Sequence, residues 1–124
     1  LQTPTSVFYL GKEMENIVTY PAGSDHDTVR FERITDTKNT YYSYFYAGLF
    51  MRMVIAQWAY AGYDITGNPG VLATLYNLGF NRSIPKQNPA PGGAPITVNG
   101  TEYNFGTLAE EFYYSGELMN EFPY

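Results

Sequence analysis

The sequence predicts a mainly α-helical fold, with about four helices, one small β-hairpin and a loop rich in proline and glycine. Three observations lead to this fold class. Apolar residues recur at helical spacing in several segments, an Asn-Gly dipeptide separates two short strand-forming runs, and residues 82–95 hold four prolines and two glycines. A chain of 124 residues with 44% hydrophobic residues is expected to form a single domain, 1–124, with a real core.

The beginning of the chain predicts one helix after a short extended segment. Residues 1–6 read as an extended lead-in around Pro4. Apolar residues then recur at three- and four-residue steps over 7–20, which predicts a helix that Gly11 weakens. Residues 21–24 break the chain, and the weak alternation of 29–34 favours a short strand or an extended connector.

The single histidine lies in an acidic segment, Ser24-Asp25-His26-Asp27. Two aspartates beside a histidine are chemically suited to a metal. Neighbouring residues in a loop rarely converge on one ion, however, and no second cluster supports a site. We therefore predict a solvated acidic loop, with no metal and no other cofactor.

Residues 37–61 are apolar or aromatic at almost every position, which is typical of a buried central helix or of a membrane span. Arg52 near the middle would cost roughly 2.5–3.5 kcal/mol in a membrane, so we predict a buried helix and no span. Thr35 or Asp36 is expected to cap this helix, and Gly62 to end it. Arg52 is either a surface residue with its stem on apolar groups or the partner of a buried C-terminal glutamate.

The next helix has strong start and stop signals. Asn68 can accept an orphan backbone N–H, Pro69 suits the first helical position, and Gly79 suits the end. Tyr76 and Asn77 fall in the last turn, where polar groups can leave the apolar face and point at a cleft. A capped core helix without a site explains the same residues. The apolar face comprises Val71, Leu72, Leu75 and Leu78.

The C-terminal third predicts a hairpin followed by a helix. Two short strands within 96–105 flank Asn99-Gly100, which favours a type I′ turn. Thr107 is expected to cap the last helix while Glu110 reaches back to the cap, and the helix should stop at 122–123. Glu110 and Glu111 could be read as a catalytic carboxylate pair. Because adjacent helical residues point about 100° apart, a structural role is favoured, and surface positions are expected for Glu117 and Glu121.

Composition excludes some classes of function. A net charge of −5 and a pI near 4.6 argue against a nucleic-acid-binding surface. The 13 tyrosines offer flat apolar faces with hydrogen-bonding tips, which suit sugars and protein partners equally. The absence of cysteine excludes disulfides and thiolate chemistry.

Residues 73–79, Ala-Thr-Leu-Tyr-Asn-Leu-Gly, resemble the A-x-Y-N-x-G segment of lytic transglycosylases and goose-type lysozymes, which belong to the lysozyme-like superfamily. The preceding long Tyr/Ala-rich helix and the break after it are also similar. The whole chain resembles a group of bacterial exported proteins in its GYDI, NPG, ATLYNLGF and AEEFYYSGEL motifs. The resemblance implies a lysozyme-like α+β fold, a periplasmic or secreted location and peptidoglycan as partner. It further implies that Tyr76 borders a catalytic Glu and that Asn77 helps to position the sugar.

The chain departs from that superfamily at the catalytic acid. The motif E-S-x-x-(N/D)-P and the following Gly-rich segment are absent, and Glu13 and Glu15 do not match them. The catalytic residue is therefore unknown, and we expect the chain to be the C-terminal portion of a longer protein whose N-terminal part is a partner. Two functions stay open: a glycan-strand-cleaving enzyme of the lytic transglycosylase type, and a non-catalytic module binding carbohydrate or protein.

Overall fold

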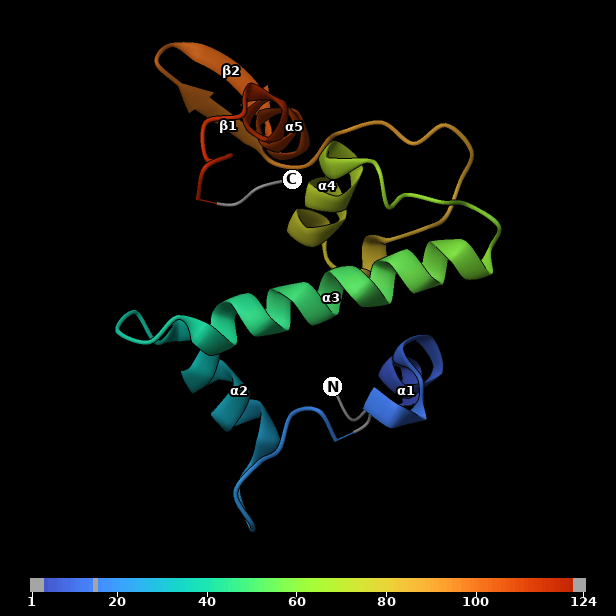
Figure 1. Cartoon of the computed structure of the whole chain (residues 1–124), viewed down its shortest axis with the longest axis vertical. Coiled ribbons are helices and arrows are strands. Elements are labelled where there is room, and N and C mark those ends of the chain that lie inside the picture. Colours follow the sequence, from blue (N-terminus) through green and yellow to red (C-terminus); the bar gives the residue numbers. More distant parts are fainter. Residues whose placement is uncertain (1–3, 15, 122–124) are drawn as a thin grey trace. The chain divides into compact units, whose positions relative to one another are not determined.

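A computed structural model describes residues 4–14 and 16–121 (Figure 1). These residues form a mainly helical fold with one two-stranded antiparallel hairpin, which confirms the predicted fold class. They group into two compact units, Leu1–Ala56 and Gln57–Tyr124, whose boundary falls within α3. The elements are α1 Pro4–Leu10, η1 Lys12–Met14, α2 His26–Thr35, α3 Tyr41–Tyr60, α4 Pro69–Leu78, η2 Phe80–Arg82, β1 Pro95–Val98, β2 Thr101–Asn104 and α5 Phe105–Ser115.

The first helix begins earlier and ends sooner than predicted. α1 starts at Pro4, so the expected extended lead-in is wrong over 4–6, since proline suits the first turn of a helix. It ends at Leu10, because Gly11 takes a φ of +90° and donates its N–H to the Val7 carbonyl at 2.9 Å. The predicted helix over 7–20 is therefore wrong beyond Leu10. Glu15 lies outside the described residues.

The expected strand or connector at 29–34 is wrong, because this segment belongs to α2. Local polar contacts favour the helix over the weak alternation. The Thr28 hydroxyl donates to Asp25 Oδ2 at 2.6 Å, and this bond lowers the pKa of Asp25 below its ordinary 3.8. Asp27 and Arg30 form an ion pair one helical turn apart. The predicted acidic loop is therefore wrong at His26 and Asp27, which begin α2, whereas Asp25 and Asp27 are exposed as expected.

The first unit is held together around the guanidinium group of Arg33. Its Cζ lies 4.3 Å from the ring centre of Tyr42 and 5.1 Å from that of Tyr20. It also donates to the Tyr46 hydroxyl at 3.3 Å and to the Thr19 carbonyl at 2.9 Å. Tyr46 packs in a buried cluster with Val18 and Leu49. The contacts of the Arg33 guanidinium and this apolar cluster therefore involve the same side of α3.

The long helix starts four residues later than predicted. Asp36 Oδ1 accepts the N–H groups of Lys38 and Asn39 in a turn, and Asn39 Oδ1 accepts the N–H of Tyr41. The predicted cap at Thr35 or Asp36 is therefore wrong. At the other end, Gly62 takes a φ of +96° just beyond the helix, which confirms the predicted stop.

The predicted buried helix is only partly buried. Its buried residues are Tyr46, Leu49, Val54 and Trp58, whereas Tyr44 and Tyr60 are each 76% exposed. Arg52 is exposed and forms no ion pair with a described residue, so the surface alternative is correct and the buried pair is wrong. None of the helices in the described ranges is long and apolar enough to cross a membrane.

In the second unit, α4 forms as predicted. Asn68 Oδ1 accepts the Val71 N–H at 3.1 Å, and Pro69 is the first helical residue. Gly79 ends the helix with a φ of +91° and donates to the Leu75 carbonyl at 2.9 Å. Its ψ of 163° leads the chain directly into η2.

The hairpin forms where predicted. Asn99 and Gly100 both have positive φ, 49° and 79°, as a type I′ turn requires. Val98 pairs with Thr101 across this turn, and Ile96 with Tyr103. Asn104 is the last strand residue, so the predicted strand at 105 is wrong.

The last helix starts and ends earlier than predicted. Asn104 caps it, accepting the Thr107 N–H at 2.8 Å, while the Thr107 hydroxyl accepts the Asn104 N–H at 3.2 Å. The predicted cap formed by Thr107 and Glu110 is therefore wrong, because Thr107 is the return partner of the box. Gly116, with a φ of +73°, ends α5 well before 122–123.

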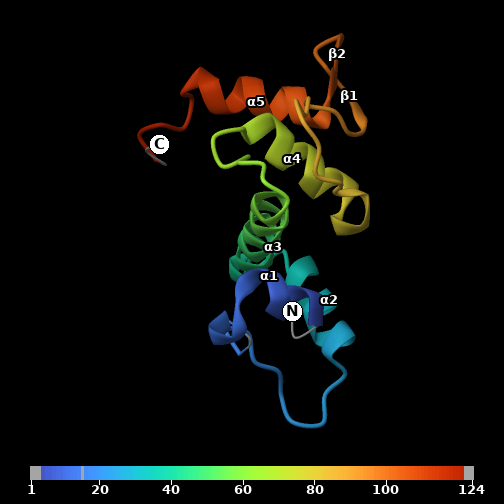
Figure 2. The same ribbon diagram turned by 90° about the vertical axis from the view of Figure 1, so that its right-hand side faces the viewer.

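α5 lies across α4, as both ribbon views show (Figures 1 and 2). Two glycines occupy the contact between these helices. A Cβ on Gly106 would lie 2.0 Å from the Thr74 hydroxyl oxygen and 2.8 Å from the Gly70 carbonyl. A Cβ on Gly70 would lie 2.5 Å from Glu110 Oε2. The close approach of the two helices therefore depends on the absence of side chains at these positions.

Candidate functional site

The Pro/Gly-rich loop is fixed between α4 and the start of α5. The Thr74 hydroxyl donates to the Gly70 carbonyl at 2.7 Å and accepts the Gly92 N–H at 2.8 Å. The Gly92 carbonyl accepts the Gly106 N–H at 2.8 Å, and Phe105 N–H binds the Ala94 carbonyl at 2.9 Å. These backbone bonds give the loop one defined path over the C-terminal half of α4.

Asn77 holds the same loop one turn further along α4. Its Oδ1 accepts the Ala94 N–H at 2.8 Å, which orients the carboxamide. Gly93 lies beside it with a φ of +96°, and a Cβ there would lie 2.7 Å from the same oxygen. The Nδ2 group is the donor of this carboxamide, and it bonds to no described residue, so it can donate to a ligand.

An open depression of about 490 Å³ lies at this point. It brings together the amide donor of Asn77 and the exposed guanidinium of Arg82, the last residue of η2. Both of these side chains can donate hydrogen bonds, so they suit a ligand rich in oxygen acceptors. Its lining comprises Asn77, Leu78, Arg82, Gly93 and Ala94.

Arg82 is positioned by a set of polar contacts behind η2. The Trp58 indole N–H donates to the Ser83 hydroxyl at 2.9 Å, and that hydroxyl donates to Gln57 Oε1 at 2.6 Å. Gln57 Nε2 in turn donates to the Ser83 carbonyl at 3.0 Å. Trp58 is 2% exposed and Ser83 4%, so these bonds are shielded from water and fix the residue next to Arg82.

The two residues singled out by the sequence lie in different surroundings. Asn77 lines the depression, whereas Tyr76, which is 45% exposed, is not among the residues that line it. The structure adds Arg82 and Gly93, which sequence reasoning missed. The only signals for them were a basic residue just past a helix end and a Gly-Gly pair in a Pro-rich segment.

The carboxylates do not gather at this depression. Glu110 is half-buried against Gly70, and Glu111 is exposed. Glu117 and Glu121 are exposed, as expected. None of these groups is among the described residues that line the depression.

The described residues contain no group of three or more potential metal ligands from His, Cys, Asp and Glu. His26 instead stacks on the ring of Tyr20, with 4.2 Å between the ring centres and 15° between their planes. The expected absence of a metal or another cofactor stays a prediction.

A smaller depression of about 230 Å³ lies where α5 passes the start of α4. Tyr113 and Tyr114 form one wall, with their ring centres 5.2 Å apart, and Pro69 and Leu72 contribute from α4. Thr66 and Gly67 complete it. Tyr114 is 66% exposed, so a second aromatic surface is accessible on this unit.

Comparison of the chain with protein-family models, with curated protein sequences and with solved structures finds no match.

Proposed function

We propose that this chain binds the glycan strands of peptidoglycan, with Asn77 and Arg82 contacting the strand and Tyr76 flanking it. The observation that carries the proposal is the fixed carboxamide of Asn77. Its oxygen is held by the Ala94 N–H, which leaves the Nδ2 donor for a ligand in an open depression of about 490 Å³. A donor that is oriented before binding loses little conformational entropy when the ligand arrives.

The chemistry of the depression suits this polymer. Glycan strands present hydroxyl and acetamido oxygens, which can accept from Nδ2 of Asn77. Peptidoglycan also carries carboxylates, which a guanidinium group such as that of Arg82 can bind through two parallel hydrogen bonds. Tyr76, 45% exposed on the adjacent position of α4, offers an aromatic face to a sugar ring.

Cleavage of the strand would need an acid from outside this chain. In a lytic transglycosylase one Glu acts first as acid and then as base, and the sugar closes an intramolecular anhydro ring. The lining of the depression contains no carboxylate, so Asn77 would orient sugar rather than transfer a proton. We therefore propose that any cleavage depends on a Glu in the N-terminal part of a longer protein, which would act in the periplasm or outside the cell.

The lack of a carboxylate in the lining of the depression favours a second function, a non-catalytic module that binds carbohydrate or protein. A depression with donors and without a carboxylate can retain a glycan without cutting it. Under this alternative the lysozyme-like fold is degenerate, and the exposed tyrosines contribute to binding.

Sedimentation with purified cell-wall sacculi tests binding. The chain should co-sediment with the sacculi. Replacing Asn77 with alanine or Arg82 with glutamine should weaken retention about tenfold, because each change removes one well-oriented or charge-assisted hydrogen bond. Arg52→Gln is the matched control, because Arg52 is also exposed and lies outside the depression. Equal retention of all four proteins would refute the site.

Turbidity of a sacculus suspension separates the two functions. The full-length protein should lower turbidity if an acid is supplied from elsewhere, and Tyr76→Phe should then slow the loss. Retention by the full-length protein without any loss of turbidity would support the non-catalytic module.

A further inference from the structure

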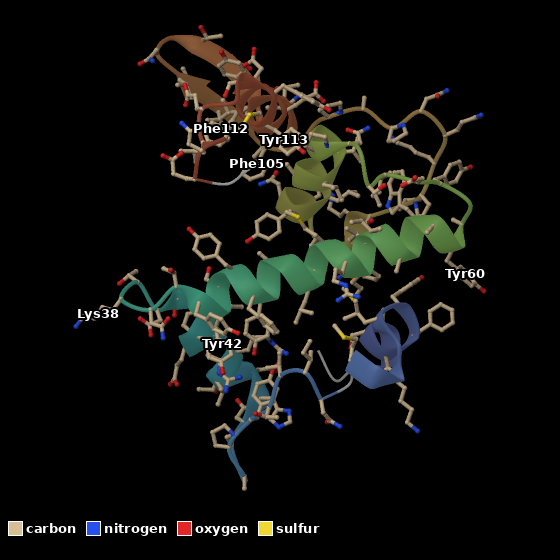
Figure 3. All side chains as sticks on the ribbon, viewed as in Figure 1. Lys38, Tyr42, Tyr60, Phe105, Phe112 and Tyr113 are labelled. Atoms are coloured by element: carbon tan, nitrogen blue, oxygen red, sulfur yellow. The ribbon has the colours of Figure 1, made fainter. Side chains whose placement is uncertain are left out.

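An apolar groove lies between the hairpin and α5, on the same unit as Asn77 but with none of its lining residues in common. Its volume is about 410 Å³. Phe105 and Phe112 contribute from α5 (Figure 3). The other lining residues are Ile96, Val98, Leu108 and Ala109.

The pattern of the two elements explains the groove. Ile96 and Val98 alternate along β1 and so face the same side of the hairpin. The four α5 residues occupy positions i, i+3, i+4 and i+7, which form one helical face. The groove remains accessible within its unit, because Phe112 is 47% exposed and Val98 39%.

Almost no polar atom faces this groove, so the walls offer no hydrogen bonds to a ligand backbone. An extended peptide would bury backbone N–H and C=O groups there without partners, at a cost of about 1–3 kcal/mol for each group. A helix satisfies its own backbone and presents only side chains. The groove therefore favours an amphipathic helix over a strand.

The charge near the groove indicates which charge a bound helix should carry. From residue 87 to the end, the sequence contains five glutamates and no lysine or arginine. Glu111 is exposed on α5, three residues beyond Leu108 of the groove, whereas Glu102 pairs with Thr97 and therefore lies on the other side of the hairpin from Ile96 and Val98. A second copy of this chain would bring a second Glu111 to the same face without a lysine or arginine from residues 87–124, which opposes a dimer through this face.

We propose that this groove binds a basic amphipathic helix of a partner protein, with the apolar side chains in the groove and lysine or arginine toward Glu111. The inference does not rest on glycan binding, since the two surfaces share no lining residue.

Calorimetric titration with designed peptides tests this assignment. The probe is a helix-forming peptide of about 18 residues, with leucine at i, i+3, i+4 and i+7 and lysine elsewhere. A second peptide has glutamate in place of every lysine. We expect the lysine peptide to bind at least tenfold more tightly, and its affinity to fall about threefold or more when the salt concentration rises from about 0.1 to 0.5 M.

Three variants locate the binding. Phe112→Ser should weaken the lysine peptide about tenfold, and Val98→Thr, which keeps the strand-forming branch, about threefold. Phe31→Ser is the matched control, since Phe31 is 68% exposed on α2, outside the groove, and it should change affinity less than twofold. Circular dichroism of each variant establishes that helix content is unchanged.

Several results would overturn the proposal. These are no binding of the lysine peptide, equal binding of the glutamate peptide, or an equal loss in Phe31→Ser and Phe112→Ser. Sedimentation equilibrium showing a dimer that Phe112→Ser disperses would make a second copy the occupant. Nuclear Overhauser contacts between Val98 methyls and Phe122 or Tyr124 in the free protein would give the groove to the end of this chain instead.

Discussion

Replacing Gly106 with alanine should destabilise the second unit, although the same change usually stabilises a helix. The added methyl would lie 2.0 Å from the Thr74 hydroxyl oxygen, 2.8 Å from the Gly70 carbonyl oxygen and 2.9 Å from the Gly92 nitrogen. All three distances are shorter than real Cβ contacts, and two of the neighbours are backbone atoms that cannot rotate away. Either α5 moves off α4, or the Thr74 hydroxyl leaves the loop.

The expected magnitude follows from these contacts. Overpacking costs about 1–3 kcal/mol. Losing the bond between the Thr74 hydroxyl and the Gly92 N–H adds about 1 kcal/mol. The better helix propensity of alanine offsets at most about 1 kcal/mol. The free energy of unfolding should therefore fall by about 1–4 kcal/mol, which lowers the urea midpoint by on the order of 1 M.

Trp58 provides the assay, since it is 2% exposed, belongs to the same unit and is the only tryptophan. Its fluorescence should report the lower midpoint in Gly106→Ala. Gly48→Ala is the matched control: Gly48 lies inside α3 with no atom within 4 Å of a Cβ, so there the change should raise stability by about 0.5–1 kcal/mol, measured by circular dichroism. A Gly106→Ala protein as stable as the parent would refute the close approach of the helices.

Three further predictions concern contacts that hold the fold. Ser83→Ala should lower the free energy of unfolding by about 1–3 kcal/mol in urea titrations followed by fluorescence, because the buried indole N–H of Trp58 loses its acceptor; an unchanged midpoint would contradict this. Asn104→Ala should cost about 1 kcal/mol in thermal unfolding followed by circular dichroism, because α5 loses its cap, and a change below about 0.3 kcal/mol would count against the capping box. Thr28→Val should raise the pKa of Asp25 toward 3.8 in an NMR titration, since the bond that lowers it is removed. Because the pKa of Asp25 is lower in the folded state, its contribution to stability is present above pH 3.8 and is lost as pH falls through the lowered value. An unchanged pKa of Asp25 in Thr28→Val would show that the Thr28 hydroxyl is not the cause of the shift.

The sequence predicted elements well where a few adjacent residues determine the backbone. Asn68 and Pro69 start α4 as predicted, and Asn99-Gly100 forms the tight turn of the hairpin. In these cases the deciding interaction lies within three or four residues, such as the bond from the Val71 N–H to Asn68 Oδ1. Such interactions persist in any tertiary context, so local reading was sufficient.

Local reading was wrong where two local signals competed. Thr107 and Glu110 match a capping box, but Asn104 and Thr107 form one three residues earlier. Asn104 also ends β2, and the Phe105 N–H binds the Ala94 carbonyl, so the hairpin and the loop determine where α5 begins. The choice between the two possible caps thus depended on the contact with Ala94, which lies ten positions before Asn104.

By itself, the sequence determined a mainly helical chain with one hairpin, and it singled out Asn77 on α4. Only the tertiary structure placed Gly93 and Ala94 against that side chain and Arg82 beside it. No periodicity links residues 77, 82 and 93, because the path of a Pro/Gly-rich loop depends on which groups it meets. In this chain those groups are the hydroxyl of Thr74 and the backbone of Gly106, and both are available only because α5 lies directly on α4.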